Sequence, residues 1–256
     1  MNYRAFTIHF TNNRTARAIQ VRYEDELATA LIELGLGWRP TFVVVGGAAR
    51  LDRSRTAKIY HLFHDALAPL AQEWDAYVVD GATDSGVIQM MGTAREETAA
   101  TFPLVGVAAI GTVALTMPSQ HDAFPLEPNH THFILVPGDK WGDESRWIAR
   151  VASRLAASQP SVTVLINGGE VTYQDAAHSV EHDRPVIVVA GSGRTADLLA
   201  AAIRGEPSEE RAQRLVQTGL LSAIDLSAGP EELWTAIETS VRRPVVLAEP
   251  AYEIAR

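Results

Sequence analysis

The sequence predicts an α/β protein with a Rossmann-like, doubly wound and mainly parallel sheet that has helices on both faces. Short apolar runs rich in Val and Ile recur along the chain, and helical patterns separate most of them. Near-continuous hydrophobicity indicates strands buried on both faces, as in a parallel sheet. Their alternation with helices is typical of a doubly wound fold.

Six apolar runs are expected to form the central strands. They are TFVVVGG (41–47), AYVVDG (76–81), PLVGVAAIG (103–111), HFILVPG (132–138), SVTVLINGG (161–169) and PVIVVAGSG (185–193). All six end in a segment that contains glycine. Because ligands bind outside the carboxyl ends of strands in open α/β sheets, we expect these loops to converge on one crevice. The alternative is that each glycine only lets a strand turn into its helix.

Apolar residues at every fourth position predict helices in the segments between these runs. The clearest cases are RTAKIYHLFHDALAPLA (55–71) and ESRWIARVASRLAA (144–157). Before them, a strand or hairpin (5–10 and 17–23) is expected to lead into a helix (24–36). After them, two further helices are expected (206–221 and 229–241), with a last strand in RRPVVLAEP (242–250).

The chain of 256 residues is expected to form a single domain (1–256), since no repeat or low-complexity linker divides it. Within it we distinguish an N-terminal strand and helix extension (1–39), a core (40–205) and a C-terminal helical extension (206–256). No apolar stretch is long enough for a membrane span, and the N-terminus lacks the apolar region of a secretion signal, so a cytoplasmic location is expected.

Charge and cysteine content narrow the classes of function. A formal charge of −9 disfavours a nucleic-acid partner, because phosphate neutralisation needs clustered Lys and Arg. The absence of Cys excludes disulfides, thiolate metal sites and a Cys nucleophile. His130 and His132 lie on one face of a strand and are candidate metal ligands, but no third ligand has a convincing spacing. We therefore expect no metal and no required cofactor.

Two strand-to-helix segments have the composition of a phosphate or ribose cradle. VVDGATDSGVIQMMG (78–92) and VIVVAGSGRTADLLA (186–200) place glycines, hydroxyls and one Arg at a helix start, whose free N–H groups attract anions. The second lacks the third glycine of a dinucleotide fingerprint and has Ala196 there. It can also be read as a simple glycine-rich turn.

Two carboxylates follow the fifth of the six apolar runs (161–169). Glu170 and Asp175 are five residues apart near the expected crevice and are suited either to acid–base chemistry or to binding hydroxyls. Asp143 stands where a helix N-cap is expected and is not assigned a catalytic role. Neither a G-x-S-x-G elbow nor a P-loop motif is present.

The ordered segments VVVGGA, VVDGATDSGVIQMMG, LEPNHTHFILV, SVTVLINGG and RPVIVVAGSGRTADLLA resemble a known family. It is the SLOG-type (LSDAT) domain of the cytosolic N-terminal region of TRPM ion channels, in its stand-alone prokaryotic version. The resemblance covers roughly residues 40–205. It implies a Rossmann-like domain that senses or binds a nucleotide derivative, with ADP-ribose and NAD-related molecules as the ligand class.

The wider superfamily includes LOG-type phosphoribohydrolases, which carry a P-G-G-x-G-T-x-x-E motif. The corresponding stretch here is NGGEVTYQD (167–175), in which Asn167 replaces Pro, Val171 replaces the third Gly and Asp175 stands at the Glu position. The resemblance therefore keeps an alternative open: an N-glycosidase acting on a nucleoside monophosphate or NAD-like substrate, with Asp175 and Glu170 as catalytic candidates.

The expected ligand-binding residues come from the glycine-containing loops. They are Gly46, Gly47, Gly81, Thr83, Asp84, Ser85, Gly86, Gly111, Thr112, Gly168, Gly169, Glu170, Gly191, Ser192, Gly193, Arg194 and Thr195. We expect the diphosphate against the 191–195 turn and the 81–86 loop, and the ribose near Glu170 or Asp84. Five Trp and apolar residues on the last helix also suggest a homo-dimer, unless Trp234 and Ile237 simply pack on the sheet.

Overall fold

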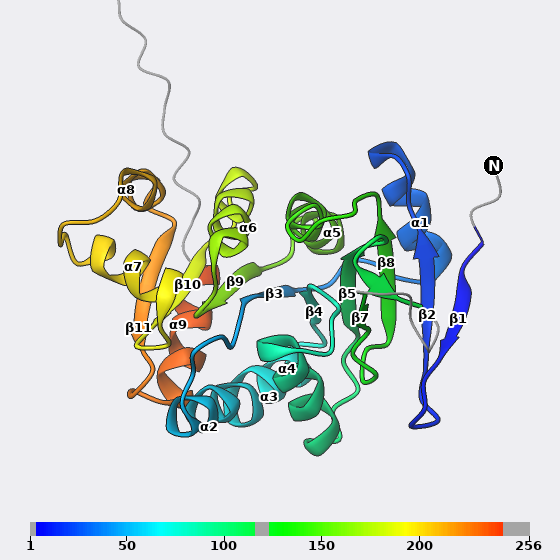
Figure 1. The fold of residues 1–256 in the computed structure, drawn as a ribbon, viewed down its shortest axis with the longest axis horizontal. Coiled ribbons are helices and arrows are strands. Elements are labelled where there is room, and N and C mark those ends of the chain that lie inside the picture. Colours follow the sequence, from blue (N-terminus) through cyan, green and yellow to red (C-terminus); the bar gives the residue numbers. More distant parts are fainter. Residues whose placement is uncertain (1–3, 116–122, 243–256) are drawn as a thin grey trace, which may run out of the picture.

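The computed structural model describes residues 4–115 and 123–242, and its centre is a sheet of nine described strands (Figure 1). Their order across the sheet is β1-β2-β8-β5-β4-β3-β9-β10-β11. The strands are β1 (Phe6–His9), β2 (Thr15–Gln20), β3 (Thr41–Gly46), β4 (Tyr77–Asp80), β5 (Leu104–Ala109), β8 (His132–Val136), β9 (Ser161–Ile166), β10 (Val186–Ala190) and β11 (Leu221–Asp225). Two short strands, β6 (Val113–Ala114) and β7 (Phe124–Pro125), pair separately.

All neighbouring strands of the large sheet are parallel except β1 and β2, which form an antiparallel hairpin at one edge. Every residue of β4, β5 and β10 is buried. Burial on both faces explains why these segments are apolar without alternation. The prediction of a doubly wound, mainly parallel α/β sheet is confirmed.

Helices cover both faces of the sheet (Figure 1). One face carries α1 (Leu27–Leu34), α5 (Ser145–Ala156), α6 (Glu170–Glu181), α7 (Arg194–Ile203) and α8 (Glu210–Gln217), preceded by the 3₁₀ turn η1 (Glu24–Glu26). The other carries α2 (Arg53–Leu62), the π-helical turn η2 (Phe63–Leu67), α3 (Ala68–Glu73), α4 (Gly86–Glu97) and α9 (Pro230–Arg242). Each layer buries its own apolar cluster against the sheet.

The six runs identified in the sequence all form strands, and the N-terminal hairpin and the helices also form where they were expected. The short strands β6 and β7 were not expected, and neither was one strand of the large sheet. β11 was partly assigned to the preceding helix, because LSAID is a short edge strand in which only Leu221 and Ile224 are buried. The strand expected at 242–250 lies, after its first residue, outside the described residues.

The last helix packs within the chain. Leu233 and Ile237 of α9 are fully buried, and Trp234 packs against the same cluster. These apolar residues, which suggested a dimer, are therefore accounted for by packing on the sheet, and the homo-dimer stays a prediction. Over residues 4–115 and 123–242, no helix is both long and apolar enough to cross a membrane.

Candidate functional site

A pocket lies where the winding of the sheet changes direction. From β3 the chain proceeds to β4 and β5 on one side, whereas from β9 it proceeds to β10 and β11 on the other. The crevice outside the carboxyl ends of β3 and β9 is thus a topological switch point, the usual ligand position in this architecture. A pocket with a volume of about 480 Å³ occupies it.

Nine of the seventeen ligand-binding residues expected from the sequence line this pocket: Gly46, Gly47, Gly81, Thr83, Ser85, Gly86, Gly169, Glu170 and Arg194. Asp175, one of the two catalytic candidates, lines it as well. Eight expected residues are not part of its lining: Asp84, Gly111, Thr112, Gly168, Gly191, Ser192, Gly193 and Thr195. The pocket thus draws on the loops after β3, β4, β9 and β10, whereas the loop after β5 lies elsewhere.

Several of the eight hold the loops of the pocket together. The hydroxyl of Ser192 is buried, accepts the N–H of Asn167 at 2.8 Å and donates to the carbonyl of Val189 at 2.6 Å. The Asn167 side chain in turn donates to the carbonyl of Ser192 at 2.7 Å. The hydroxyl of Thr195 donates to the carbonyl of Gly169 at 2.9 Å. These contacts fix the turns after β9 and β10 against each other.

Helix starts form much of the pocket wall. Ser85, Gly86 and Ile88 belong to the start of α4, and Gly169 with Glu170 belongs to the start of α6. The first N–H groups of a helix have no partner within it, and they give this end a partial positive charge. The pocket wall is therefore suited to an anionic group.

One cation, the Arg194 guanidinium, lies beside this wall. Arg194, the first residue of α7, places its Nη2 only 2.7 Å from where a β-carbon on Gly169 would stand. Its guanidinium therefore lies against the start of α6. By contrast, the N–H of Gly191 already donates to the Asp197 carboxylate at 2.6 Å, and that of Ala196 donates to the Asn167 carbonyl. The 191–195 turn thus offers fewer N–H groups than its sequence suggested.

An exposed aromatic side chain stands at the pocket. Trp141 lines it, is 48% exposed, and meets Phe124 edge-to-face with ring centroids 5.0 Å apart. Such a braced and accessible ring can stack on a planar group of a ligand. The sequence analysis did not single out Trp141, which comes from the loop after β8.

Two buried carboxyl groups also line the pocket. Burial raises the pKa of Asp175, the Ser145 side chain opposes this shift and the charge of the nearby Glu144 adds to it, so that the resulting pKa is about 7. Burial likewise raises the pKa of Glu144, although the Gly142 N–H donates to it at 3.1 Å. The expectation that Asp143 caps α5 is wrong: Glu144 holds the N-cap position, and Asp143 accepts the N–H groups of Asp139 and Lys140.

Glu170 is a different kind of carboxylate. It is exposed and pairs with Arg211 of α8 at 2.5 Å, and this hydrogen bond lowers its pKa. Arg211 also contacts Glu209 and lies 3.8 Å from the ring centroid of Tyr173. Glu170 therefore remains ionised at neutral pH, whereas burial raises the pKa of the other two carboxyls.

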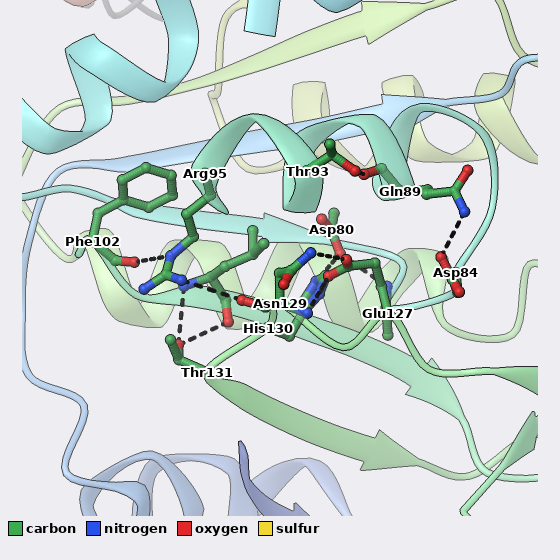
Figure 2. A network of polar contacts seen from close by, with 12 residues as sticks. Asp80, Asp84, Gln89, Thr93, Arg95, Phe102, Glu127, Asn129, His130 and Thr131 are labelled. Atoms are coloured by element: carbon green, nitrogen blue, oxygen red, sulfur yellow. Dashed lines mark hydrogen bonds and ion pairs between the residues drawn. The ribbon is translucent and has the colours of Figure 1, made fainter. Parts of the chain in front are cut away.

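A buried polar network contacts the start of the 81–86 loop (Figure 2). His130 contacts Asp80 through Nε2 and Glu127 through Nδ1, both at 2.8 Å, and all three side chains are buried. Burial lowers the pKa of His130, but the two carboxylates outweigh this effect and raise it to about 9. His130 is therefore an imidazolium at neutral pH.

The network joins segments that are distant in the sequence. Asp80 and His130 are 50 positions apart, and the N–H groups of Asp84 and Glu127 donate to the carbonyls of Pro125 and Ala82. The segment 124–130 thus runs beside the 80–84 loop. The partner Asp80 could not be identified for His130 from the sequence, because it lies on another segment of the chain.

His132 does not join this network. Its Nδ1 contacts the hydroxyl of Thr131 at 2.8 Å, and burial together with Arg17 lowers its pKa to about 4. Over the two described ranges, no group of three His, Asp or Glu side chains is arranged to hold a metal ion.

Residues that the sequence analysis missed come from β3 and the loop after it, from the loop after β8, and from the starts of α4, α5 and α6. They are Val44, Val45, Ala48, Ala49, Ile88, Trp141, Glu144, Ile148, Val171 and Thr172. The signal that could have identified Trp141 is a large aromatic residue between two turn-forming segments, GDK and GDE. Glu144 could have been identified as a carboxylate at a helix start.

Fold and site together define a Rossmann-like α/β domain with a ligand pocket at its topological switch point. The family model described as SLOG in TRPM, prokaryote, matches residues 39–235. The chain belongs to this family. The resemblance noted in the sequence is thereby confirmed.

Curated relatives agree with this assignment. The rat transient receptor potential cation channel subfamily M member 2 is 25% identical over 214 residues, which covers 69% of this chain and 14% of the rat protein. The mouse protein of that name is 25% identical over 194 residues, which covers 61% of this chain and 13% of the mouse protein. The transient receptor potential cation channel subfamily M member-like 2 of Nematostella vectensis is 24% identical over 184 residues, which covers 57% of this chain and 12% of that protein. The chain thus spans about one seventh or less of these relatives.

A crystal structure of TM1055 shares the fold. Its TM-score is 0.52 at 18% identity, and the match covers 78% of this chain and 99% of that one.

Proposed function

We propose that this domain binds a nucleotide derivative of the ADP-ribose or NAD-related class in the switch-point pocket and acts as a ligand sensor. The observation that carries the proposal is the convergence of helix starts, Arg194 and an exposed Trp on one pocket. Such a pocket offers an anion site and a stacking surface side by side. The family resemblance implies the same ligand class.

The phosphates lie against the starts of α4 and α6 in this proposal. The first helical residues of α4 and α6 bring main-chain N–H groups there, because these groups have no partner within their helix, and Arg194 adds a full positive charge. The N–H groups of Ser85 and Gly169 are already donated to the Thr83 carbonyl at 2.7 Å and to the Thr172 hydroxyl at 3.2 Å. Because several N–H groups of the 191–195 turn have partners within the protein, that turn contributes chiefly through Arg194. The planar base stacks on Trp141, and the ribose lies between, near Glu170.

Calorimetry with ADP-ribose, NAD, AMP and cyclic dinucleotides tests this proposal. We expect Arg194→Ala to weaken binding by about 1.5–3 kcal/mol, because a charge-assisted phosphate contact is lost. Arg204→Ala is the matched control. Arg204 is an exposed arginine at the other end of α7 that pairs with Glu206, so this change should leave affinity unaltered. Absence of binding by all four ligands in the unmodified protein contradicts the proposal.

A second function, N-glycosidase activity on a nucleoside monophosphate or NAD-like substrate, is favoured by one observation. Asp175 stands at the position of the LOG-type Glu and lines the pocket. Cleavage of an N-glycosidic bond develops positive charge on the ribose, which a carboxylate stabilises. This activity predicts free adenine or nicotinamide from AMP or NAD.

Asp175→Asn separates the two functions. An enzyme should lose turnover far more than affinity in this variant, since the interaction is made mainly in the transition state. A binding domain should release no base even when unmodified. Chromatography of the reaction mixture distinguishes the outcomes, and base release that disappears in Asp175→Asn identifies the enzyme.

A further inference from the structure

The pocket contains two carboxyl groups that have no cationic partner. Among its described lining residues only four are ionisable, namely Glu144, Glu170, Asp175 and Arg194. Glu170 is exposed and tied to Arg211. Glu144 and Asp175 are only 7% and 8% exposed, and neither forms an ion pair within the described residues.

The elements packed around this pair supply no compensating charge. α6 packs against α5, α7 and α8, and against strands β3, β9 and β10, which carry no ionisable side chain. On α5, Arg146 stacks on Trp147 and Arg150 pairs with Glu24. Asp80, at the end of β4, is held by His130.

The remaining charges nearby are also engaged. Arg211 and Glu209 of α8 contact each other, Asp197 of α7 accepts the Gly191 N–H, and Asp143 accepts two main-chain N–H groups. Arg194 is directed at Gly169. The two carboxyls therefore depend on each other and on the ligand for their state of charge.

A second observation points to a ligand or a proton at this place. Oδ1 of Asp175 is buried and has no hydrogen-bond partner among the described residues. A buried and unpartnered carboxylate oxygen is costly, and two neighbouring carboxyls cannot both ionise cheaply in such surroundings. Retention of one proton relieves both costs.

We propose that Glu144 and Asp175 share a single proton and form the part of the pocket that receives the uncharged, ribose-bearing end of the ligand. This inference rests on the proposed function and deepens it. The pair donates one hydrogen bond and accepts others, which suits sugar hydroxyls. It repels phosphate, so the phosphates are directed to the starts of α4 and α6 and to Arg194, and the orientation of the ligand is fixed.

Proton uptake on binding is the direct test. ADP-ribose is the probe, because its bridging diphosphate does not titrate near neutral pH. Calorimetry from pH 5.5 to 8.5, in two buffers with different heats of protonation, gives the number of protons bound. Since the raised pKa of Asp175 is about 7, we expect uptake to rise above pH 7 toward one proton. The affinity should then fall by up to about tenfold per pH unit.

Variants assign the effect to the pair. Asp175→Asn should abolish the uptake and flatten the pH dependence. Glu144→Gln should move the step to lower pH, because the like charge that raises the pKa of Asp175 is gone. The control is Glu181→Gln, at the exposed far end of α6, which should behave as the unmodified protein. Uptake that persists in Asp175→Asn overturns the inference.

A measurement without ligand keeps this test apart from that of the proposed function. Infrared difference spectra should show the carbonyl band of a neutral carboxylic acid at pH 6, which is lost at pH 8.5 and absent from Asp175→Asn. If ADP-ribose fails to bind but the band is present, the proposed function fails and the shared proton stands. If the unmodified protein lacks the band at pH 6, the shared proton is refuted whether or not ligand binds.

Discussion

The residue His130 is a buried imidazolium between Asp80 and Glu127. Its pKa in the folded protein is about 9, against an ordinary 6.5. Because the folded value is the higher one, the stabilisation is complete below pH 6.5 and is lost as pH rises through 9. The shift corresponds to on the order of 3 kcal/mol of unfolding free energy. We expect urea unfolding at pH 6, 7.5 and 9 to show this decline.

Two variants assign that decline to His130. His130→Gln should be less stable at pH 6 and should lose the decline between pH 7.5 and 9, whereas His9→Gln, at an exposed histidine, should follow the unmodified protein. Should His130→Gln fail to fold, the histidine ring protons of the unmodified protein can be followed by NMR instead. A His130 signal that titrates near pH 6.5 contradicts the assignment.

At the scale of elements, the close approach of α4 to the 124–130 segment depends on one small residue. A β-carbon on Gly92 would lie 2.2–2.3 Å from the carboxylate of Glu127, which also accepts hydrogen bonds from Asn129 and contacts His130. Gly92→Ala therefore displaces Glu127 from a satisfied network.

We expect Gly92→Ala to destabilise the protein by about 2–4 kcal/mol. A loss of stability is informative here, because alanine in place of glycine otherwise stabilises a helix by about 1 kcal/mol. Gly37→Ala is the matched control, since nothing lies within 4 Å of its β-carbon position. Thermal unfolding of the two variants measures the difference, and equal midpoints would show that α4 and the segment can separate without cost.

Elements whose residues are buried on both faces could be predicted from the sequence, because burial leaves an uninterrupted apolar run. β3, β4, β5, β8, β9 and β10 were located in this way. β11 could not be, since an edge strand with one covered face has a weak and mixed pattern. The carboxyl ends of strands were located as well, and with them Gly46, Gly86, Gly169 and other residues of the pocket wall.

At the scale of the whole molecule, the unpredicted part of the site comes from contacts between distant segments. Trp141 and Glu144 follow β8, four positions away from β9 in the sheet, and reach the pocket only because α5 passes back over β3. The partners of His130 are likewise distant in the sequence. Periodicity reports local burial, and it carries no information on which loop approaches which.

The order of strands also bears on how the chain is made. Arg17 of β2 pairs with His132 of β8, 115 positions later, and β1 contacts the sheet only through β2. At about 5–20 residues per second, a ribosome needs roughly 6–23 s to synthesise that interval. Throughout this time the first hairpin has left the exit tunnel without the strand that it joins. The hairpin is therefore incorporated into the sheet late, and until β8 is made the edge of β2 that pairs with it stays open to other strands.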